Sequence, residues 1–494
     1  MNDYSPDASA ALARAVPQAL PKAERTLADQ LAAWLRLRID EHALKPGTRL
    51  PSIRRFAAEK GVSRSTVVDA YDRLIAGGYV DSRRGAGFFV RARRAAPVPP
   101  KARPQQRLAA DAHAIDVVWL LRSMLRQSPA SDQPGAGLLP PAWLDSDLVG
   151  AAVRAIGRTA GRASGRGSAG AGDTLLGYGV PEGFLPLRQQ LVQRLALADI
   201  GATPEQIVTT NGVTHGIDLV ARHFIAPGDV VLVEDPAWFV MFGRFAAFGA
   251  KVVGVPRGPD GPDTTVLANL LTRHQPKLFV VGSVLHNPTG TSISAANAHR
   301  LLKLAEEYRF TIVEDDVYGD LAHGRALRLA SLDQLRRVIY VGGFSKTLAA
   351  NLRVGFVAAH PALARELRDI KALTGLSSSE LGERVVARII IERKYERMLE
   401  GLRSKLDECR ARTAEALVGM GVSVAGPPPG GMYLWADFGR DTNEIATAGS
   451  REGVLCAPGS LFSPTQLPST WMRVAAATCL NATAMAFLQR AMRG

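Results

Sequence analysis

The chain has 494 residues, 47% of them hydrophobic, so it is long enough to form two or more domains with substantial cores. It has no run of about eighteen apolar residues and no basic start followed by an apolar stretch, which argues against a membrane span or a secretory signal and predicts a cytoplasmic protein. The formal net charge is +14, and residues 1–110 hold 20 Lys and Arg against 10 Asp and Glu, so we expect a polyanionic partner for the front of the chain unless that surface is basic only for solubility.

Three closely spaced helical patterns follow a tail, residues 1–23, that is predicted to be disordered. Apolar residues recur at helical spacing over residues 26–44 and 52–62, with the turn KPGTRLPS between them. A third helix is predicted to begin after Ser63, a good N-cap, and to stop at a Gly-Gly pair. The next segment, YVDSRRGAGFFV, alternates and turns through glycines, which predicts a two-stranded hairpin with arginines at its tip.

A helix, a helix-turn-helix and a basic wing form an arrangement suited to DNA. The second helix of the pair enters a major groove with its N-terminal residues at the base edges, while the wing and the helix starts contact backbone phosphates. The predicted DNA-contacting residues are Arg49, Ser52, Arg54, Ser63, Arg64, Ser65, Thr66, Arg83, Arg84 and Gly87. The alternative is a generic helical bundle with solvated arginines. The segments RLPSIRRFA, GVSRSTVVDAYDRLIAGGYV and GAGFFV resemble the GntR-type winged helix over residues 24–90, which implies double-stranded DNA as partner.

The composition changes beyond Val90. RARRAAPVPPKARPQQRL predicts an extended, solvated linker over residues 91–110, followed by a second domain over residues 111–494. Inside that domain the Gly-, Ser- and Arg-rich residues 157–172 are predicted to form a flexible loop. From about residue 200, short Val, Ile and Leu runs alternate with helical patterns, which indicates an α/β domain of parallel strands covered by helices on both faces.

Three of the predicted strands end at polar motifs. KLFVVGSV is followed by LHNPTG, RFTIVED by DVYGD, and RRVIYVGG by FSKTL. Ligands of such sheets lie beyond the carboxyl ends of the strands, so Asn287, Asp315 and Lys346 are expected to meet in one crevice.

That set of residues suits pyridoxal phosphate chemistry, in which a lysine amine forms an imine and the ring withdraws electrons. Lys346 is the candidate for the imine. A buried carboxylate opposite the ring nitrogen keeps that nitrogen protonated, and Asp315 fits this role. Asn287 and Tyr318 are candidates to bond the ring hydroxyl.

The phosphate and the ring face need further partners. The segment NGVTHGIDLVARHF is predicted to offer helix-start amides near Val213 and the hydroxyl of Thr214, with Arg353 as a permanent cation. Trp238 follows another strand, where its indole is placed to stack on the pyridine. Ser345, next to the lysine, completes the predicted cofactor contacts.

Each element alone has a plain alternative, because an isolated Ser-Lys is usually a surface pair, NPTG can be a simple turn, and a tryptophan is more often in the core. Together and in this order they resemble the fold-type I aminotransferases over about residues 110–494. A winged helix joined by a linker to such a body resembles the MocR-like group of GntR regulators. The resemblance implies a mainly parallel sheet covered by helices, with a small C-terminal α+β subdomain.

The resemblance also implies roles for single residues. It makes Lys346 the Schiff-base lysine, with Asp315 and Tyr318 as its catalytic partners. Arg473, in WMRVAAAT, matches the arginine that holds the carboxylate of an amino acid. Tyr178, in LLGYGVPEGF, matches a tyrosine that reaches the phosphate of the neighbouring subunit in a homodimer.

Three positions depart from the family pattern. Gly343 stands where a serine or threonine usually contacts the phosphate, and Val213 and His215 stand where serine and glutamine are common. Weaker cofactor binding is the expected consequence. The three cysteines form no CxxC pair, so no metal site is predicted.

The leading hypothesis is a homodimeric transcriptional regulator that presents two heads to repeated half-sites on DNA. Its body is expected to sense pyridoxal 5'-phosphate, another B6 vitamer or an amino acid through an aldimine at Lys346. One alternative is an active aminotransferase that carries a DNA-binding domain. Another is a body that only dimerises, which Gly343 favours and the retained Lys346, Asp315 and Arg353 oppose.

Overall fold

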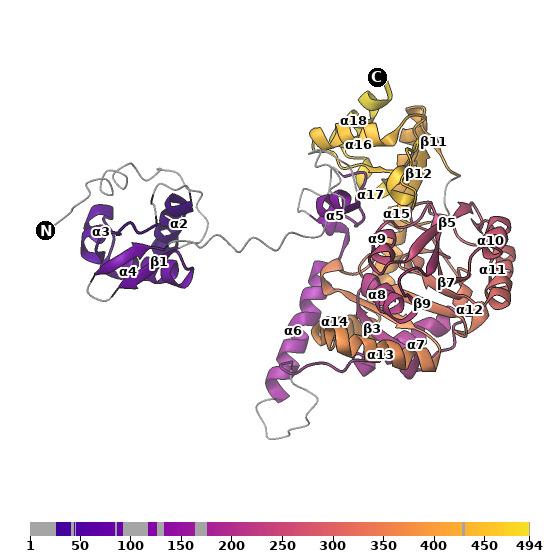
Figure 1. Ribbon diagram of the computed structural model, residues 1–494, viewed down its shortest axis with the longest axis horizontal. Helices are drawn as coiled ribbons and strands as arrows, with labels where there is room; N and C mark the ends of the chain where they lie inside the picture. Colours follow the sequence, from indigo (N-terminus) through magenta and orange to yellow (C-terminus); the bar gives the residue numbers. More distant parts are fainter. Residues whose placement is uncertain are drawn as a thin grey trace. The chain divides into compact units, whose positions relative to one another are not determined.

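The computed structural model describes residues 26–40, 44, 46–83, 86–91, 117–125, 133–163, 175–426 and 430–493. The chain divides into two compact units, residues 1–109, here called the head, and residues 110–494, here called the body (Figure 1). The predicted tail, nearly all of the predicted linker and Arg84 lie outside the described residues.

The head contains the three predicted helices and the predicted hairpin. Its elements are α2 (Leu27–Asp40), α3 (Ile53–Lys60), α4 (Arg64–Ala76), β1 (Val80–Arg83) and β2 (Gly87–Val90). The two strands pair antiparallel, and α3 and α4 begin at serine N-caps. Phe56 and Tyr71 are fully buried and stack at 5.8 Å between ring centroids. The predicted helix, helix-turn-helix and wing are confirmed.

The body is built on an eight-stranded sheet with the order β3-β10-β9-β8-β7-β4-β5-β6. The strands are β3 (Ile207–Asn211), β4 (Val230–Asp235), β5 (Lys251–Gly258), β6 (Gly261–Pro262), β7 (Pro276–Val281), β8 (Thr311–Asp315), β9 (Val338–Gly343) and β10 (Val354–Ala358). The strands from β9 through β5 are parallel, whereas β10 is antiparallel to both of its neighbours. The predicted mainly parallel sheet is confirmed.

Both faces of this sheet are buried, which is why its strands are continuous apolar runs. In β4, Leu232 packs into one core cluster while Val231 and Val233 pack into another, and β7 alternates in the same way. The surrounding helices are visible in Figure 1. They are α5 (Val117–Leu125), α6 (Ser146–Ala163), α7 (Leu185–Leu197), α8 (Val213–Phe224), α9 (Val240–Ala247), α10 (Thr264–Leu271), α11 (Ala295–Tyr308), α12 (Leu329–Asp333), α13 (Pro361–Gly375), α14 (Glu380–Ile391) and α15 (Lys394–Gly419).

A smaller subdomain ends the chain, as predicted. Its four-stranded antiparallel sheet has the order β11-β12-β14-β13 and its own apolar core. The elements are β11 (Ser423–Val424), β12 (Tyr433–Asp437), α16 (Thr442–Arg451), β13 (Ala457–Pro458), β14 (Trp471–Ala475), α17 (Ala476–Cys479) and α18 (Ala482–Arg493).

The predicted loop over residues 157–172 is wrong in its first part. Helix α6 continues to Ala163 despite Gly157 and Gly161, because adding residues to a helix that has already begun avoids the cost of starting a new one. Residues 164–172 lie outside the described part of the chain.

Two further findings bear on function. None of the described helices is both long and apolar enough to cross a membrane. Across the described ranges, no three His, Cys, Asp or Glu side chains are grouped so that they could hold a metal ion.

Candidate functional site

The carboxyl ends of β7, β8 and β9 bring three predicted residues to one edge of the sheet. Asn287 lies six residues beyond β7, Asp315 is the last residue of β8, and Lys346 lies three residues beyond β9. Asn287 and Asp315 line one cavity of about 20 Å³ together with Trp238 and Tyr318. Four predicted cofactor residues from three separate segments of the chain therefore line one cavity.

Asp315 lies in a setting that disfavours its charged form. Burial raises the pKa of this carboxyl to about 7, and the neighbouring Asp316 adds to the effect. Its side chain accepts a hydrogen bond from the backbone N–H of Val317 at 3.3 Å. A nearby cation would therefore bind strongly to this carboxylate.

Lys346 is half-buried, and its Nζ donates to the backbone carbonyl of Gly137 at 2.6 Å. Burial lowers the pKa of this amine, with Arg473 and Arg353 adding to the effect while Tyr433 and Asp315 oppose it. A lowered pKa increases the fraction of neutral, nucleophilic amine.

Arg473 is 1% exposed, and its guanidinium joins two parts of the site. Its Nη1 donates to Asn287 Oδ1 at 3.1 Å, and Asn287 Nδ2 donates to the Tyr318 hydroxyl at 3.3 Å. That hydroxyl also pairs with the hydroxyl of Tyr433 at 3.3 Å. The Arg473 guanidinium lies 4.3 Å from the centroid of the Tyr433 ring, and its Nε has no hydrogen-bond partner among the residues that the structure describes.

A short segment, residues 133–137, lies against Lys346 and Arg473. Sequence patterns did not predict that this segment belongs to the site. Arg473 Nη2 donates to the carbonyls of Gly135 at 2.8 Å and Ala136 at 3.3 Å. The Gly137 carbonyl accepts from Lys346 and, at 3.4 Å, from the Tyr433 hydroxyl. The segment has no helical or alternating pattern, and its contacts are made by backbone carbonyls, so residue types carry no signal for it.

The start of α8, predicted to hold a phosphate, lies against Arg353. Its N-cap, Gly212, has a φ of 75°, and an added Cβ there would lie 2.6 Å from Arg353 Nη2. Arg353 also donates to the Asn211 carbonyl at 2.8 Å, so its guanidinium lies across the helix start. Thr214, in the first turn of α8, is half-buried.

The two main departures from the family pattern lie side by side. An added Cβ at Gly343 would be 3.2 Å from Val213 Cγ2 and 3.2 Å from the Val354 carbonyl. Both contacts are tighter than an ordinary van der Waals distance. The isopropyl group of Val213 therefore occupies space that a side chain at position 343 would need.

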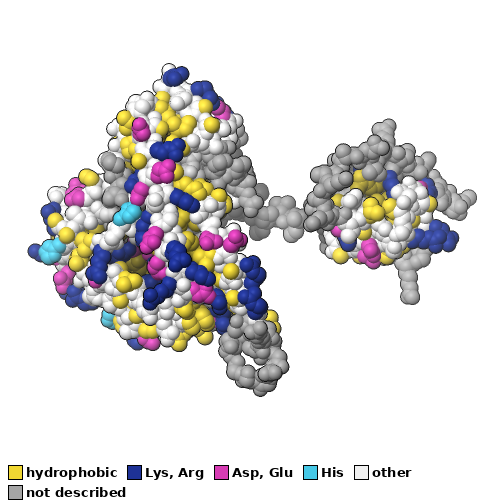
Figure 2. Space-filling view, turned by 180° about the vertical axis from the view of Figure 1, so that it is seen from behind, with side chains coloured by type: hydrophobic (Ala, Val, Ile, Leu, Met, Phe, Trp, Pro, Cys, Tyr) yellow, Lys and Arg dark blue, Asp and Glu magenta, His cyan; other side chains and the backbone are white. Residues whose placement is uncertain are grey.

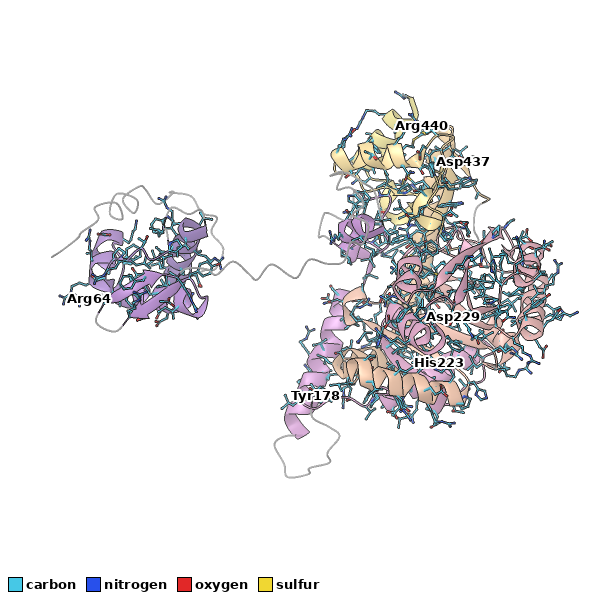
Figure 3. All side chains as sticks on the ribbon, in the orientation of Figure 1. Arg64, Tyr178, His223, Asp229, Asp437 and Arg440 are labelled. Atoms are coloured by element: carbon cyan, nitrogen blue, oxygen red, sulfur yellow. The ribbon has the colours of Figure 1, made fainter. Side chains whose placement is uncertain are left out.

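The remaining predicted body residues have different surroundings. Trp238 is half-buried and lines the cavity beside Asp315, while Ser345 is half-buried next to Lys346. Tyr178 is 85% exposed, and Figure 3 shows it at the edge of the body. His215 accepts a hydrogen bond at Nδ1 from the backbone of Asn211 at 3.1 Å, and burial lowers its pKa.

In the head, the predicted serines cap helices. The Ser52 hydroxyl accepts from the Arg55 backbone at 3.4 Å, and that of Ser63 accepts from the Thr66 backbone at 3.1 Å. The Ser63 hydroxyl also pairs with those of Ser65 at 2.7 Å and Thr66 at 2.8 Å. These bonds fix the start of α4.

The predicted arginines of the head have more than one setting. Arg64 and Arg54 are exposed, and Figure 3 shows Arg64 pointing outward. The Arg83 guanidinium lies 4.7 Å from the centroid of the Phe89 ring, and Arg49 packs against Gly87, whose φ is 107°. Figure 2 shows Lys and Arg side chains gathered at an edge of the head, while basic and acidic side chains are mixed on the body.

Comparisons with known proteins agree with this geometry. The family model "Aminotransferase class I and II" matches residues 145–490, and the model "Bacterial regulatory proteins, gntR family" matches residues 27–90. The probable rhizopine catabolism regulatory protein MocR of Rhizobium meliloti is 30% identical over 76% of this chain and 73% of its own length. The 2-aminoadipate transaminase of Thermus thermophilus is 33% identical over 59% of this chain and 74% of its own. The crystal structure of LysN, an alpha-aminoadipate aminotransferase from Thermus thermophilus, superposes with a TM-score of 0.68 at 27% identity, covering 76% of this chain and 94% of that one.

Proposed function

Because the chain belongs to the MocR-like group of GntR transcriptional regulators and its body to the aminotransferase class I and II family, we propose that it regulates transcription in response to pyridoxal 5'-phosphate, another B6 vitamer or an amino acid bound at Lys346. The observation that carries this proposal is the meeting of Lys346, Asp315 and Arg473 at the strand ends of a protein that also has a DNA-binding head.

The residues around Lys346 fit pyridoxal phosphate. When bound, this cofactor supplies an aldehyde that reacts with amines and a ring that withdraws electrons. Lys346 supplies an amine whose pKa is already lowered. Asp315, which makes no ion pair within the described part of the chain, gains a cationic partner in a protonated ring nitrogen and holds that proton in place.

The other contacts follow from the same arrangement. The amides at the start of α8, the Thr214 hydroxyl and Arg353 hold the phosphate. Trp238, Asn287 and Tyr318 line one cavity, where Trp238 would stack on the ring face and Asn287 and Tyr318 would bond the ring hydroxyl.

The contacts of residues 133–137 supply a way to sense an amino acid. A ligand carboxylate needs the N–H groups of Arg473 that now donate to the carbonyls of Gly135 and Ala136. Carboxylate and carbonyl oxygens repel each other, so binding favours a shift of this segment. Gly137 also touches Met124 of α5, since an added Cβ there would lie 2.3 Å from Met124 Cε. Ligand binding thereby changes the position of α5, the described body helix nearest in sequence to the head. Such a contact, different with and without ligand, is what coupling between the ligand site and the head requires.

Two heads are proposed to act together on repeated half-sites. The body exposes several large apolar side chains, of which Leu381 lines one pocket with Tyr178, and the dimer of this proposal buries them against a second copy. They are Leu176, Leu373, Leu376 and Leu381. A single soluble chain rarely leaves such a surface uncovered. A two-fold pair of bodies would present two recognition helices to two half-sites.

A second candidate function is catalysis of amino-group transfer. The observation that favours it is that Lys346, Asp315 and Arg473 are all present, together with the 33% identity to a 2-aminoadipate transaminase. Sustained release of keto acid at about one turnover per second or faster would identify an enzyme.

The first experiment is the visible absorption spectrum of the purified protein with pyridoxal 5'-phosphate, alongside Lys346→Ala. We expect a band that depends on Lys346. A panel of amino acids is then added, and DNA binding is measured for each.

The outcomes separate the candidates. An amino acid that shifts the band and changes DNA affinity without sustained turnover supports the sensor. Continuous turnover supports the enzyme. A spectrum identical to that of Lys346→Ala excludes the cofactor and leaves a body that only dimerises.

A further inference from the structure

A closed ring of hydrogen-bonded side chains ties the loop that carries Asn287 to the strand ends, and its charged members are buried. Its charged members are Glu234 at the end of β4, Arg257 in β5 and His286 in the loop after β7. The exposed fractions of these side chains are 1%, 0% and 3%. Such complete burial of two ionised groups requires that each be paired.

The charged members bond one another and the strand ends. Arg257 Nη1 pairs with Glu234 Oε1 and also donates to the Gly282 carbonyl at 3.0 Å. Glu234 Oε2 accepts from the Gly282 backbone N–H at 2.7 Å and lies 3.3 Å from His286 Nε2. Strands β4, β5 and β7 are thereby joined at their carboxyl ends.

Two threonine hydroxyls close the ring. His286 Nδ1 lies 2.9 Å from Thr289 Oγ1, which lies 2.8 Å from Thr291 Oγ1. Arg257 Nε donates to Thr291 Oγ1 at 3.1 Å. The ring therefore runs from Arg257 through both threonines and His286 to Glu234, and from there back to Arg257.

The direction of every hydrogen bond in the ring is fixed. Burial lowers the pKa of His286 to about 4, so the imidazole of His286 is neutral near pH 7 and carries one N–H. Glu234 only accepts, which places that proton on Nε2 and leaves Nδ1 as an acceptor. Thr289 must then donate to His286, and Thr291 must donate to Thr289 while accepting from Arg257.

We propose that this ring positions Asn287, and that Thr289, His286 and Glu234 are positioning residues for the ligand site. The proposal rests on the proposed function, because the group positioned is the one that would bond the cofactor. Two backbone hydrogen bonds limit the movement of the loop. The backbone N–H of His286 donates to the Thr291 carbonyl at 2.8 Å, and the backbone N–H of Gly290 donates to the His286 carbonyl at 2.6 Å. Asn287 sits inside this turn and connects Arg473 with Tyr318.

The test removes one hydroxyl and leaves the shape of the side chain. Thr289→Val keeps the volume but takes away the hydroxyl that donates to His286 Nδ1. We expect the affinity for pyridoxal 5'-phosphate to fall about tenfold, the loss that outer-shell partners cause in metal sites. We also expect the pH midpoint of the visible cofactor band to move, because the position of the groups around the hydroxyl of the cofactor's pyridine ring changes. Thr289→Ser restores the hydroxyl and should restore both values.

The control is Thr447→Val in α16. This threonine is also half-buried, and its hydroxyl donates to the Asn443 carbonyl at 2.7 Å, far from the site in sequence. It should change neither the affinity nor the pH midpoint.

A double-mutant cycle separates positioning from general stability. If Thr289 acts through Asn287, then Thr289→Val in the Asn287→Ala background changes cofactor affinity by less than about twofold. Full additivity, no rescue by Thr289→Ser, or equal behaviour of Thr289→Val and Thr447→Val would overturn the inference and leave the proposed function intact. A wild-type protein without any cofactor band would remove the proposed function and this inference together.

Discussion

In the head the arginines predicted to contact DNA are mostly at the surface, whereas in the body Arg473 and Arg257 are buried and already bonded, and only Arg353 of the arginines named at the site is exposed. Arg54 and Arg64 are exposed, and the hydroxyls of Ser52 and Ser63 accept from backbone groups only three positions away. Arg473 and Arg257, by contrast, bond to residues from distant parts of the chain. The head therefore exposes the cations that DNA binding requires, whereas the body holds Arg473 and Arg257 in its interior, where the proposed ligand would meet Arg473. Substitutions should consequently affect binding alone in the head, and binding together with stability in the body.

The largest difference is expected for the stability of the folded protein. Arg473→Ala leaves the carbonyls of Gly135 and Ala136 without their donor in a buried place, so we expect a loss of about 2–4 kcal/mol in the free energy of unfolding. Arg64→Ala should change it by less than about 0.5 kcal/mol. Chemical denaturation of both variants measures this. Equal midpoints for the two would contradict the comparison.

The next largest effect is expected for DNA. Arg64 begins α4, the helix predicted to enter the major groove. Arg64→Ala should weaken binding by about 1–3 kcal/mol on duplexes selected by the wild-type protein from random sequence. The cofactor spectrum should stay unchanged. Arg388→Ala, on the exposed side of α14, serves as the control for charge loss on the body, and it should leave DNA affinity as it is.

A smaller effect concerns pH and the cofactor-free protein. The pKa of Asp315 is about 7 in the folded state and about 4 in an unfolded chain, so folding is favoured at low pH and this contribution is lost as pH rises through 7. Asp315→Asn removes this pH-dependent loss of folding stability. We expect the variant to be more stable than wild type by about 1–2 kcal/mol at pH 8 and equally stable at pH 4. Thermal unfolding at both pH values tests this, and a difference that is larger at pH 4 would reverse the sign.

The smallest effect concerns the two departures near the start of α8. Gly343→Ser alone should not improve cofactor affinity, because its Cβ meets Val213. Val213→Ser with Gly343→Ser removes that contact and adds two hydroxyls, so we expect a gain of up to about 1 kcal/mol over either single variant. Cofactor titration of the three proteins measures it. Strictly additive changes would show that the two positions are independent.

How much the sequence predicts also differs between the two regions. The head depends on local signals, namely N-caps, helical spacing and a glycine turn, and its three helices and hairpin were predicted. In the body, strand ends predicted which side chains share an edge, because parallel strands all end on the same side. The ends of strands do not reveal which backbone carbonyls approach Arg473, or that Arg257 and His286 share Glu234. Those contacts depend on tertiary packing between segments far apart in sequence, and no residue pattern encodes them.

Residues 133–137 also bear on where the body begins. The family match starts at residue 145, yet the Thr478 hydroxyl donates to the Gln133 carbonyl at 2.8 Å, and the Ala475 N–H donates to the Pro134 carbonyl at 2.7 Å. A body shortened to residue 145 would lack the partners of Lys346, Arg473 and two residues of the C-terminal subdomain. Limited proteolysis that cuts before residue 133 should leave the ligand site whole. A cut after residue 137 should instead release residues 133–137, which bond both to the part of the body with the large sheet and to the C-terminal subdomain.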